Sequence, residues 1–465
     1  MSKSTPMTYK TFRAGLPPNQ TLLLPFTLES WLRPDHPAIA LADLVDSLDL
    51  SPILNTYHEL RGQPPYDPRI MVKIFVYAYS VGIRSSRRIE RSLYDDVAMR
   101  FLSGNQQPKF TRIAEFRRRH HEALGNILVQ TVLLGKQAGL IAPEHDVAVD
   151  GTKYRGNASK HSAMSYAYME EEEKRLQDEI ESVLLDMEST DRVEDDRYGP
   201  QKPGWTLTDE PVLKTKRLER IEQAKAELEA RARARAEAKE AEPQAKAAAK
   251  GKTVAPKDPA QAVVDPKDQY NFTDPESRIL QSRNEGFIQG FNGQAAVDAD
   301  SMLIVAADVP GQSTDYGQLV GMIDQATENI GAAPAGVLGD AGYFSAENIA
   351  AMEESGVEAL IPPNRIPHRQ WREETGEPED LPDDAGVRAT MREKMRRKEI
   401  RARYKRRQET VEPTFGYLKE VQGQRQELLR GEAKARSMWR FQCAVYNFMK
   451  LVRAGVCPQV AMGTV

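Results

Sequence analysis

Cysteine is scarce in this sequence, and long apolar runs are missing. Of 465 residues only Cys443 and Cys457 are cysteines, which excludes a disulfide-stabilised scaffold and a zinc site built from cysteines. The apolar run TLLLPF at residues 21–26 is far shorter than the roughly 18 residues that a membrane-spanning helix needs. No apolar segment near the N-terminus is followed by a small-residue cleavage site. We therefore expect a cytoplasmic protein with no membrane part.

A strong excess of one charge is also missing from the whole chain, although not from its parts. The formal net charge is only −4, so total charge does not indicate a nucleic-acid partner. Residues 388–407, in contrast, hold eleven Lys and Arg against two Glu. Such a local patch can bind phosphates even when the total charge is near neutral. The chain is long enough for two or three domains.

The region from about 41 to 140 is predicted to be helical, because its apolar residues recur at spacings of three and four. Ser85 or Ser86 is placed to cap a helix that carries basic residues in its first turns, as in a helix laid against DNA. A solvated helix face is the alternative for each basic cluster. The first cluster comprises Arg84, Arg87, Arg88 and Arg91, and the second comprises Arg112, Arg117, Arg118 and Arg119. All of these except Arg91 and Arg112 are candidate DNA contacts.

The next part of the chain combines one strand with a long polar segment. The run HDVAVDGTKY at 145–154 changes the apolar period to two, which predicts a short strand with Asp150 at its C-terminal end. The charge-rich residues 164–269 predict helices or a helical hairpin with little apolar surface, and the low-complexity part, 241–268, predicts a disordered linker. We expect this insertion to be peripheral to any chemistry.

The C-terminal half is predicted to be an α/β layer. Two strand-like runs over 286–309, joined by a tight Asp/Ser turn, predict an antiparallel hairpin. A helix follows, with Asp315 and Gln318 spaced as a capping box. Another short strand ends in Asp340, Ser345 is placed to cap the next helix, and VEALIPP predicts a further strand. This order of elements favours a mixed sheet.

Three acids stand out by their positions. Asp150 and Asp340 each end a predicted strand, and Glu412 lies in the basic stretch YKRRQETVEPTFGYLKE. Acids at the carboxyl ends of strands lie where α/β folds bind ligands, and carboxylates suit Mg²⁺, which can assist phosphoryl displacement. Each acid also has a simpler explanation: a turn for the two aspartates, and an ion pair with Arg407 or Lys419 for the glutamate. Spacing alone does not decide whether the three converge.

Four motifs, in this order, resemble those of bacterial insertion-sequence transposases of the DDE type. The motifs are VAVDGTKYRGNASKH, DPESRI with GFIQGFNGQAAVDAD, GVLGDAGYFSAENI, and ETVEPTFGYLKE. The chain is similar in particular to the branch with a helical N-terminal transposase domain. The resemblance implies a ribonuclease-H-like mixed-sheet catalytic core (α/β), an all-α N-terminal domain and a helical charged insertion. The expected parts are an irregular N-terminal arm (1–40), a helical DNA-binding domain (41–140), the catalytic domain (141–163 with 270–455) and the insertion (164–269).

The resemblance also implies a set of site residues and partners. The family's Asp–Asp–Glu maps onto Asp150, Asp340 and Glu412, which implies Mg²⁺ (or Mn²⁺) as the cofactor. The implied partner is double-stranded DNA, both the terminal inverted repeats and the target, bound by a homodimer in the nucleoid. The expected chemistry is hydrolysis of a phosphodiester at the transposon end, followed by strand transfer into target DNA.

The family's C-terminal signature runs Tyr, two residues, Arg, three residues, Glu, six residues, Lys. Glu412 and Lys419 match its second half and share a face if the stretch is helical. Tyr404 and Arg407 have the correct mutual spacing but stand one residue too far from the glutamate. Pro413 fits if Glu412 starts a helix and the proline takes the first helical position. The resemblance implies that the lysine, the arginine and the tyrosine contact DNA.

Further hypotheses stay open beside this one. Lys153 is a candidate phosphate contact or a plain surface lysine. The chain is alternatively a catalytically silent relative that only binds DNA, or a ribonuclease-H-like nuclease without strand transfer.

Overall fold

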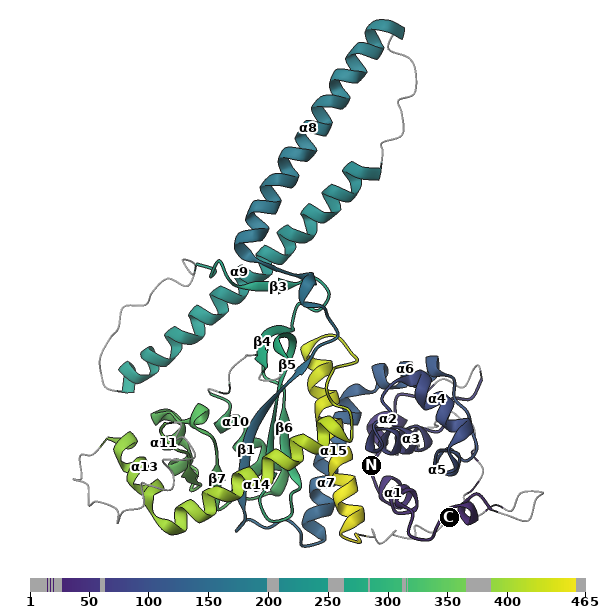
Figure 1. The fold of residues 1–465 in the computed structure, drawn as a ribbon, viewed down its shortest axis with the longest axis vertical. Helices are drawn as coiled ribbons and strands as arrows, with labels where there is room; N and C mark the ends of the chain where they lie inside the picture. The colour runs from purple at the N-terminus through teal and green to yellow at the C-terminus, as the bar shows by residue number, and fades with distance from the viewer. Residues whose placement is uncertain are drawn as a thin grey trace, which may run out of the picture. The chain divides into compact units, whose positions relative to one another are not determined.

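The computed structural model describes Gly15, Pro17, Gln20 and residues 27–58, 63–198, 209–249, 263–282, 285–311, 315, 317–364 and 386–456. The chain forms two compact units (Figure 1). The first joins Met1–Asn157 to Leu280–Val465, and the second is Ala158–Ile279. The insertion predicted over 164–269 falls within the second unit.

The N-terminal part of the first unit is helical, as predicted. Asp67 caps α3 by accepting a hydrogen bond from the Arg69 amide at 2.8 Å, and Pro68 takes the first helical position. Ser85 takes the N-cap position of α4 without a side-chain capping bond. The helices after the short turn η1 (Glu29–Trp31) are α1 (Pro37–Asp46), α2 (Ser51–Leu54), α3 (Pro68–Ser80), α4 (Ser86–Asp95), α5 (Val97–Leu102), α6 (Phe110–Arg119) and α7 (His121–Gln137).

The sheet of the first unit is mixed and has six strands. β5 pairs antiparallel with both β1 and β6, and β7 pairs parallel with both β1 and β8. An antiparallel meander followed by two parallel strands is the ribonuclease-H-like arrangement, so the predicted fold class and the predicted hairpin are confirmed. The strands are β1 (Asp146–Arg155), β4 (Arg278–Ser282), β5 (Gly286–Asp298), β6 (Ile304–Asp308), β7 (Gly336–Leu338) and β8 (Glu358–Leu360).

Among the described residues, five helices complete the α/β part, and α15 lies directly on the sheet. Trp439 of α15 stacks on Tyr154 of β1, with 5.4 Å between the ring centroids. A β-carbon at Gly293 of β5 would come within 2.7 Å of the same indole, so this close approach requires glycine. The helices are α10 (Leu319–Ile330), α11 (Ala346–Glu354), α13 (Val387–Arg396), α14 (Lys398–Glu420) and α15 (Glu432–Arg453).

The edge strand β6 is closed by side chains from these helices. Asn447 of α15 exchanges two hydrogen bonds of 2.8 Å with the amide and carbonyl of Ile304. Asn329 of α10 donates to the carbonyl of Val305 at 2.8 Å. The backbone groups of β6 that face away from β5 are therefore satisfied within the unit, which blocks pairing with another chain at this edge.

Three local predictions differ from the structure. β1 runs on to Arg155, so Asp150 lies within the strand rather than at its end. Gln318 takes the N-cap position of α10 without a side-chain capping bond, so the capping box is wrong. α14 is continuous through Pro413, so Glu412 does not start a helix. The proline leaves only the carbonyl of exposed Glu409 without its amide donor, and solvent can replace that bond.

The second unit is a two-helix hairpin with a small sheet. Its core is a narrow apolar strip, with Met169 and Leu176 from α8 and Ile221 and Leu228 from α9. Helix α9 continues to Ala249, so the linker predicted over 241–268 is partly helical, and residues 250–262 lie outside the described residues. The elements are η2 (Lys160–Ser162), β2 (Ala163–Ser165), α8 (Tyr166–Tyr198), α9 (Asp209–Ala249) and β3 (Gln269–Asn271), and β2 pairs antiparallel with β3. Across the described parts of both units, no helix is long and apolar enough to cross a membrane.

Candidate active site

Asp150 and Asp340 lie side by side because of the register between β1 and β7. The last parallel pair of these strands is Ala148 with Leu338. Each aspartate stands two residues beyond that pair, on neighbouring backbone segments that run in the same direction. Paired segments of a sheet lie about 5 Å apart, so the two carboxylates lie at the end of one parallel ladder, where sheets of this kind bind ligands. We call them the acidic pair.

The two carboxylates of the acidic pair are held in the same way. Asp150 Oδ1 accepts a hydrogen bond from the Gly151 amide at 2.8 Å, and Asp340 Oδ1 accepts one from the Gly342 amide at 2.8 Å. The second oxygen of each faces one cation, since Arg407 Nη2 lies 2.7 Å from Asp150 Oδ2 and 3.9 Å from Asp340 Oδ2. The side chain of Asp150 is 21% exposed and that of Asp340 is 44% exposed. The pair is therefore open to solvent on one side.

Arg407 reaches the acidic pair because α14 runs along β1. At one end Arg403 bonds to Asp146 at 2.6 and 3.1 Å, and Arg407 follows one helical turn later. At the other end Lys419 Nζ donates to the Lys153 carbonyl at 3.2 Å. The predicted contact residues Arg407 and Lys419 thus lie on one helix, which lines the strand that carries Asp150.

Burial dominates the electrostatics of this region. It raises the pKa of Asp150 to about 6, with Asp340 adding to the effect and Arg407 opposing it. Burial also raises the pKa of Tyr404 to about 12, which keeps its hydroxyl protonated at neutral pH. The pKa of Lys419 is lowered, again mainly by burial. A cation near the acidic pair therefore offsets the free-energy cost of burying a charged carboxylate, and Arg407 is that cation in the structure.

Glu412 does not join the acidic pair in this structure. It is exposed, and it accepts a hydrogen bond from Gln408 Nε2 at 3.3 Å. It stands five residues after Arg407, which at about 100° per residue turns its side chain roughly 140° around the helix. The family spacing of four would fall on buried Val411 instead. Glu412 shares a helix face with Lys419, as predicted, but the three acids are not assembled.

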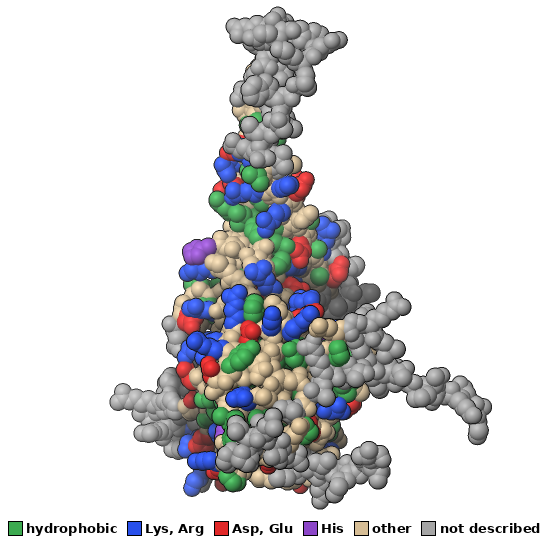
Figure 2. All heavy atoms as spheres, turned by 90° about the vertical axis from the view of Figure 1, so that its right-hand side faces the viewer, with side chains coloured by type: hydrophobic (Ala, Val, Ile, Leu, Met, Phe, Trp, Pro, Cys, Tyr) green, Lys and Arg blue, Asp and Glu red, His purple; other side chains and the backbone are tan. Residues whose placement is uncertain are grey.

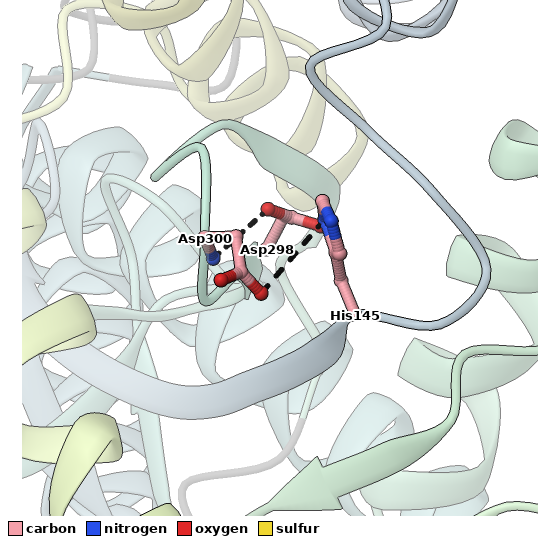
Figure 3. A group of neighbouring side chains, drawn as sticks. All are labelled: His145, Asp298 and Asp300. Atoms are coloured by element: carbon pink, nitrogen blue, oxygen red, sulfur yellow. Dashed lines mark hydrogen bonds and ion pairs between the residues drawn. The ribbon is translucent and has the colours of Figure 1, made fainter.

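A group of three side chains of the types that bind metals lies at the N-terminal end of β1 (Figure 3). One nitrogen or oxygen atom from each of His145, Asp298 and Asp300 lies within 4.8 Å of the other two. Among the described residues, this is the one group of three or more His, Cys, Asp or Glu side chains so close together. Its oxygens already have partners. Asp298 Oδ1 accepts from the Ser301 amide at 2.7 Å, its Oδ2 faces His145 Nδ1 at 2.9 Å, and Arg406 bonds to Asp300 at 2.7 Å. These contacts close the turn between β5 and β6.

The predicted DNA-contacting arginines divide into buried and exposed groups. Arg84 is 8% exposed and donates to the carbonyls of Gly423 and Gln426 at 3.0 and 2.6 Å. Arg117 is 7% exposed and donates to the carbonyl of Arg84 at 2.9 Å. The Arg84 guanidinium holds the loop after α14 in place, and the Arg117 guanidinium holds the start of α4 through Arg84 and Ser86. A solvated helix face therefore describes neither residue.

The remaining predicted arginines lie on the surface of α4 and α6. Figure 2 shows the side of the first unit that carries these helices, with Lys and Arg side chains frequent on it. Arg119 is partly engaged, since it donates to the Thr56 carbonyl at 2.9 Å. Lys153 of β1 is half-buried and donates to the Gln281 carbonyl at 3.1 Å. The exposed candidate DNA contacts of the two clusters are Arg87, Arg88, Arg118 and Arg119.

The sequence alone did not indicate three polar residues beside the acidic pair. These residues are Asp315, Gln294 and Tyr343: Asp315 accepts a hydrogen bond from the Gln294 side-chain amide, and the Tyr343 hydroxyl donates to the oxygen of the same amide. The sequence signal for them was weak. Tyr343 follows Asp340 by three residues, and Gly151, which the structure places next to Asp315, follows Asp150. Asp315 itself has the local pattern of a helix cap.

Comparison with known families decides the identity of the chain. Residues 26–119 match the family model of a transposase domain (DUF772), and residues 257–448 match that of a transposase DDE domain. The chain belongs to the DDE-type insertion-sequence transposases. Asp340 and Glu412 lie within the second match, and Asp150 lies between the two. No curated protein and no solved structure matches the sequence.

Membership carries the general activity of the family. The chain is a DNA transposase, a DNA-processing enzyme whose catalytic domain uses divalent metal ions and whose partner is DNA.

Proposed function

We propose that this transposase cuts phosphodiester bonds at the ends of its element and joins the freed 3′-hydroxyls to target DNA. Asp150 and Asp340 would hold the divalent ion, Mg²⁺ or Mn²⁺, and Glu412 would be the third acid. The observation that carries the proposal is the acidic pair, two carboxylates at the end of the parallel ladder between β1 and β7 whose outer oxygens face a single cation.

The donor set of the acidic pair fits a hard divalent cation. Carboxylate oxygens are the ligands that Mg²⁺ and Mn²⁺ prefer, and few protein ligands are needed because water and phosphate oxygens fill the rest. Both outer oxygens already face a cationic side chain, Arg407, and the 44% exposure of Asp340 leaves room for substrate. When bound, the ion would activate a hydroxyl nucleophile and stabilise the leaving oxygen. Arg407 would then be released toward the DNA phosphates, which a guanidinium binds well.

The role of Glu412 requires a rearrangement of α14. Pro413 removes the amide that would bond to the Glu409 carbonyl, so the helix is weakest at this turn. We infer that binding of DNA and metal turns this part of α14 and brings Glu412 toward the acidic pair. Tyr404 and Lys419, both half-buried on the same helix, would then position Arg407 and the DNA backbone.

The DNA-binding surface is proposed to include the exposed arginines of α4 and α6. It also includes the basic residues where α13 ends and α14 begins. Arg87, Arg88 and Arg118 are exposed, as are Arg397 and Lys398. Phosphate contacts of this kind position the duplex and do not read its sequence. Two ends must be processed together, so we propose that a homodimer acts on terminal repeats.

The experiment is a nicking assay on a duplex oligonucleotide that carries the inverted repeat flanking the gene. With Mg²⁺ the wild-type chain is expected to nick one strand at the repeat end, and Asp340→Asn is expected to bind the same duplex without nicking it. Pre-cut ends offered with a target plasmid then test strand transfer. Nicking without transfer would favour a simple nuclease, and repeat binding without any nicking would favour a silent DNA-binding relative.

A further inference from the structure

Asp315 lies beside the acidic pair and not at the helix start that its sequence pattern suggests. Its Oδ1 accepts two hydrogen bonds from side chains of β5, from Asn292 Nδ2 at 2.9 Å and from Gln294 Nε2 at 2.6 Å. Two amide donors on one carboxylate oxygen fix its position, and charge-assisted bonds of this kind are stronger than neutral ones.

Gly151, the residue after Asp150, makes this position accessible. A β-carbon there would lie 2.5 Å from Asp315 Oδ1 and even closer to Gln294 Nε2. Any side chain at 151 would therefore push Asp315 away from β1. The glycine next to the first acid of the pair is thus explained by the approach of another carboxylate to the strand.

Gln294 relays the position of Asp315 to the second acid of the pair. It is fully buried, and its amide nitrogen is used on Asp315, so its amide oxygen is the acceptor for the Tyr343 hydroxyl. Tyr343 ends the short turn η4 (Ala341–Tyr343), whose N-cap is Asp340. A chain of two hydrogen bonds therefore connects Asp315 to the turn that carries Asp340.

The charges around Tyr343 support this relay. The pKa of its buried hydroxyl is raised well above the usual value, by burial first and then by Asp315, Asp150 and Asp340. The hydroxyl thus stays protonated and donates to Gln294 throughout the physiological range. Three carboxylates raise the pKa of this single hydroxyl, and one cation, Arg407, opposes them.

We propose that Asp315 is a positioning residue of the acidic pair, acting through Gln294 and Tyr343 on the turn that carries Asp340. The inference rests on the proposed function, because it assumes that the acidic pair binds the divalent ion. Residues that hydrogen-bond to metal ligands, and so orient them, typically contribute to metal affinity. Their loss weakens metal binding about 10- to 100-fold. A misplaced ligand also slows chemistry without weakening the binding of a distant substrate surface.

The test measures Mn²⁺ affinity by electron paramagnetic resonance on the full chain without DNA. Asp315→Ala leaves two buried amides without an acceptor and is expected to weaken Mn²⁺ binding about 10- to 100-fold. Its nicking rate should fall while KM for the repeat duplex stays unchanged. Asp315→Asn keeps an oxygen that both amides can use and should bind Mn²⁺ close to the wild-type level. Asp324→Ala, an exposed aspartate of α10, is the matched control and should change nothing.

Two results would overturn the inference. One is a folded Asp315→Ala chain with wild-type Mn²⁺ affinity, and the other is an Asp315→Asn chain as impaired as Asp315→Ala, since charge and not position would then matter. If Asp315→Ala fails to fold, Tyr343→Phe removes only the hydroxyl and must also weaken Mn²⁺ binding. Failure of the wild type to nick repeat DNA would count against the proposed function alone, because the Mn²⁺ comparison is made without DNA.

Discussion

Two arginine–aspartate contacts, one helical turn apart, join α14 to β1, and they differ in kind. Arg403 grips Asp146 with two hydrogen bonds of 2.6 and 3.1 Å and also bonds to Glu358. Arg407 makes a single 2.7 Å bond to Asp150 and faces Asp340 at 3.9 Å. Asp146 is buried, whereas the acidic pair is open to solvent. The first contact is a closed clamp between helix and strand, and the second leaves carboxylate oxygens available to a ligand.

The largest expected difference between the two contacts is in DNA cleavage. Asp150→Asn replaces an oxygen that we propose binds the metal, and it should lower the nicking rate by about 10²–10³-fold or more. Asp146→Asn, assayed at a temperature where it is folded, should nick at nearly the wild-type rate. Equal losses in the two variants, measured on the repeat oligonucleotide, would remove the distinction.

The second difference is in stability. Asp146→Ala leaves Arg403 without its bidentate partner in a largely buried contact, so the free energy of unfolding should fall by about 2–3 kcal/mol. Urea unfolding followed by circular dichroism measures this. Asp340→Ala, which removes the more exposed and less tightly bonded partner, serves as the comparison and should cost less than 1 kcal/mol. A reversed order would mean that the acidic pair is the structural contact.

The open contact also predicts a pH dependence of stability. Asp150 has a pKa of about 6 in the folded chain against an ordinary value of 3.8, so between these values the folded chain binds more protons than the unfolded one. The free energy of unfolding therefore falls as pH rises through this window, by at most about 3 kcal/mol. Asp150→Asn cannot titrate, so its stability should gain on the wild type as pH rises from 4 to 7. Parallel curves for the two chains in urea unfolding would contradict the assignment.

The smallest effect concerns competition between arginine and metal. Arg407→Ala removes the cation that faces the acidic pair and should raise Mn²⁺ affinity at pH 8 about tenfold, or roughly 1.4 kcal/mol. Arg403→Ala, the matched change in the closed contact, should leave Mn²⁺ affinity unchanged. Weaker Mn²⁺ binding after loss of Arg407 would mean that the guanidinium orders the pair and does not compete.

Local sequence patterns predicted what local geometry decides. The alternation in HDVAVDGTKY and the short run before Asp340 indicated the two strands, and strand direction then brings the two aspartates together. Ser345 caps α11 as its position suggested, accepting a bond from the Asn348 amide. These features depend on residues within a few positions of one another or on the regular pairing of strands.

Long-range partners explain what the patterns could not give. Asp315 has the spacing of a helix cap, but its carboxylate oxygen accepts hydrogen bonds from Asn292 and Gln294 of β5 instead. Arg84 belongs to a basic surface cluster by sequence, yet its partners are carbonyls after α14. For Glu412 the departure from the family spacing was visible, and its consequence, a side chain turned away from Arg407, depends on how α14 is rotated against the sheet.

The central claim is that strands from distant parts of the chain build a single ion-binding site from two aspartates. Mn²⁺ titration of the DNA-free chain, with Asp150→Asn and Asp340→Asn each compared to the wild type, tests it most directly. Each substitution alone should abolish tight binding of the same Mn²⁺ ion, while both variant chains stay folded. Retention of that ion, at unchanged affinity, in either variant would contradict the account.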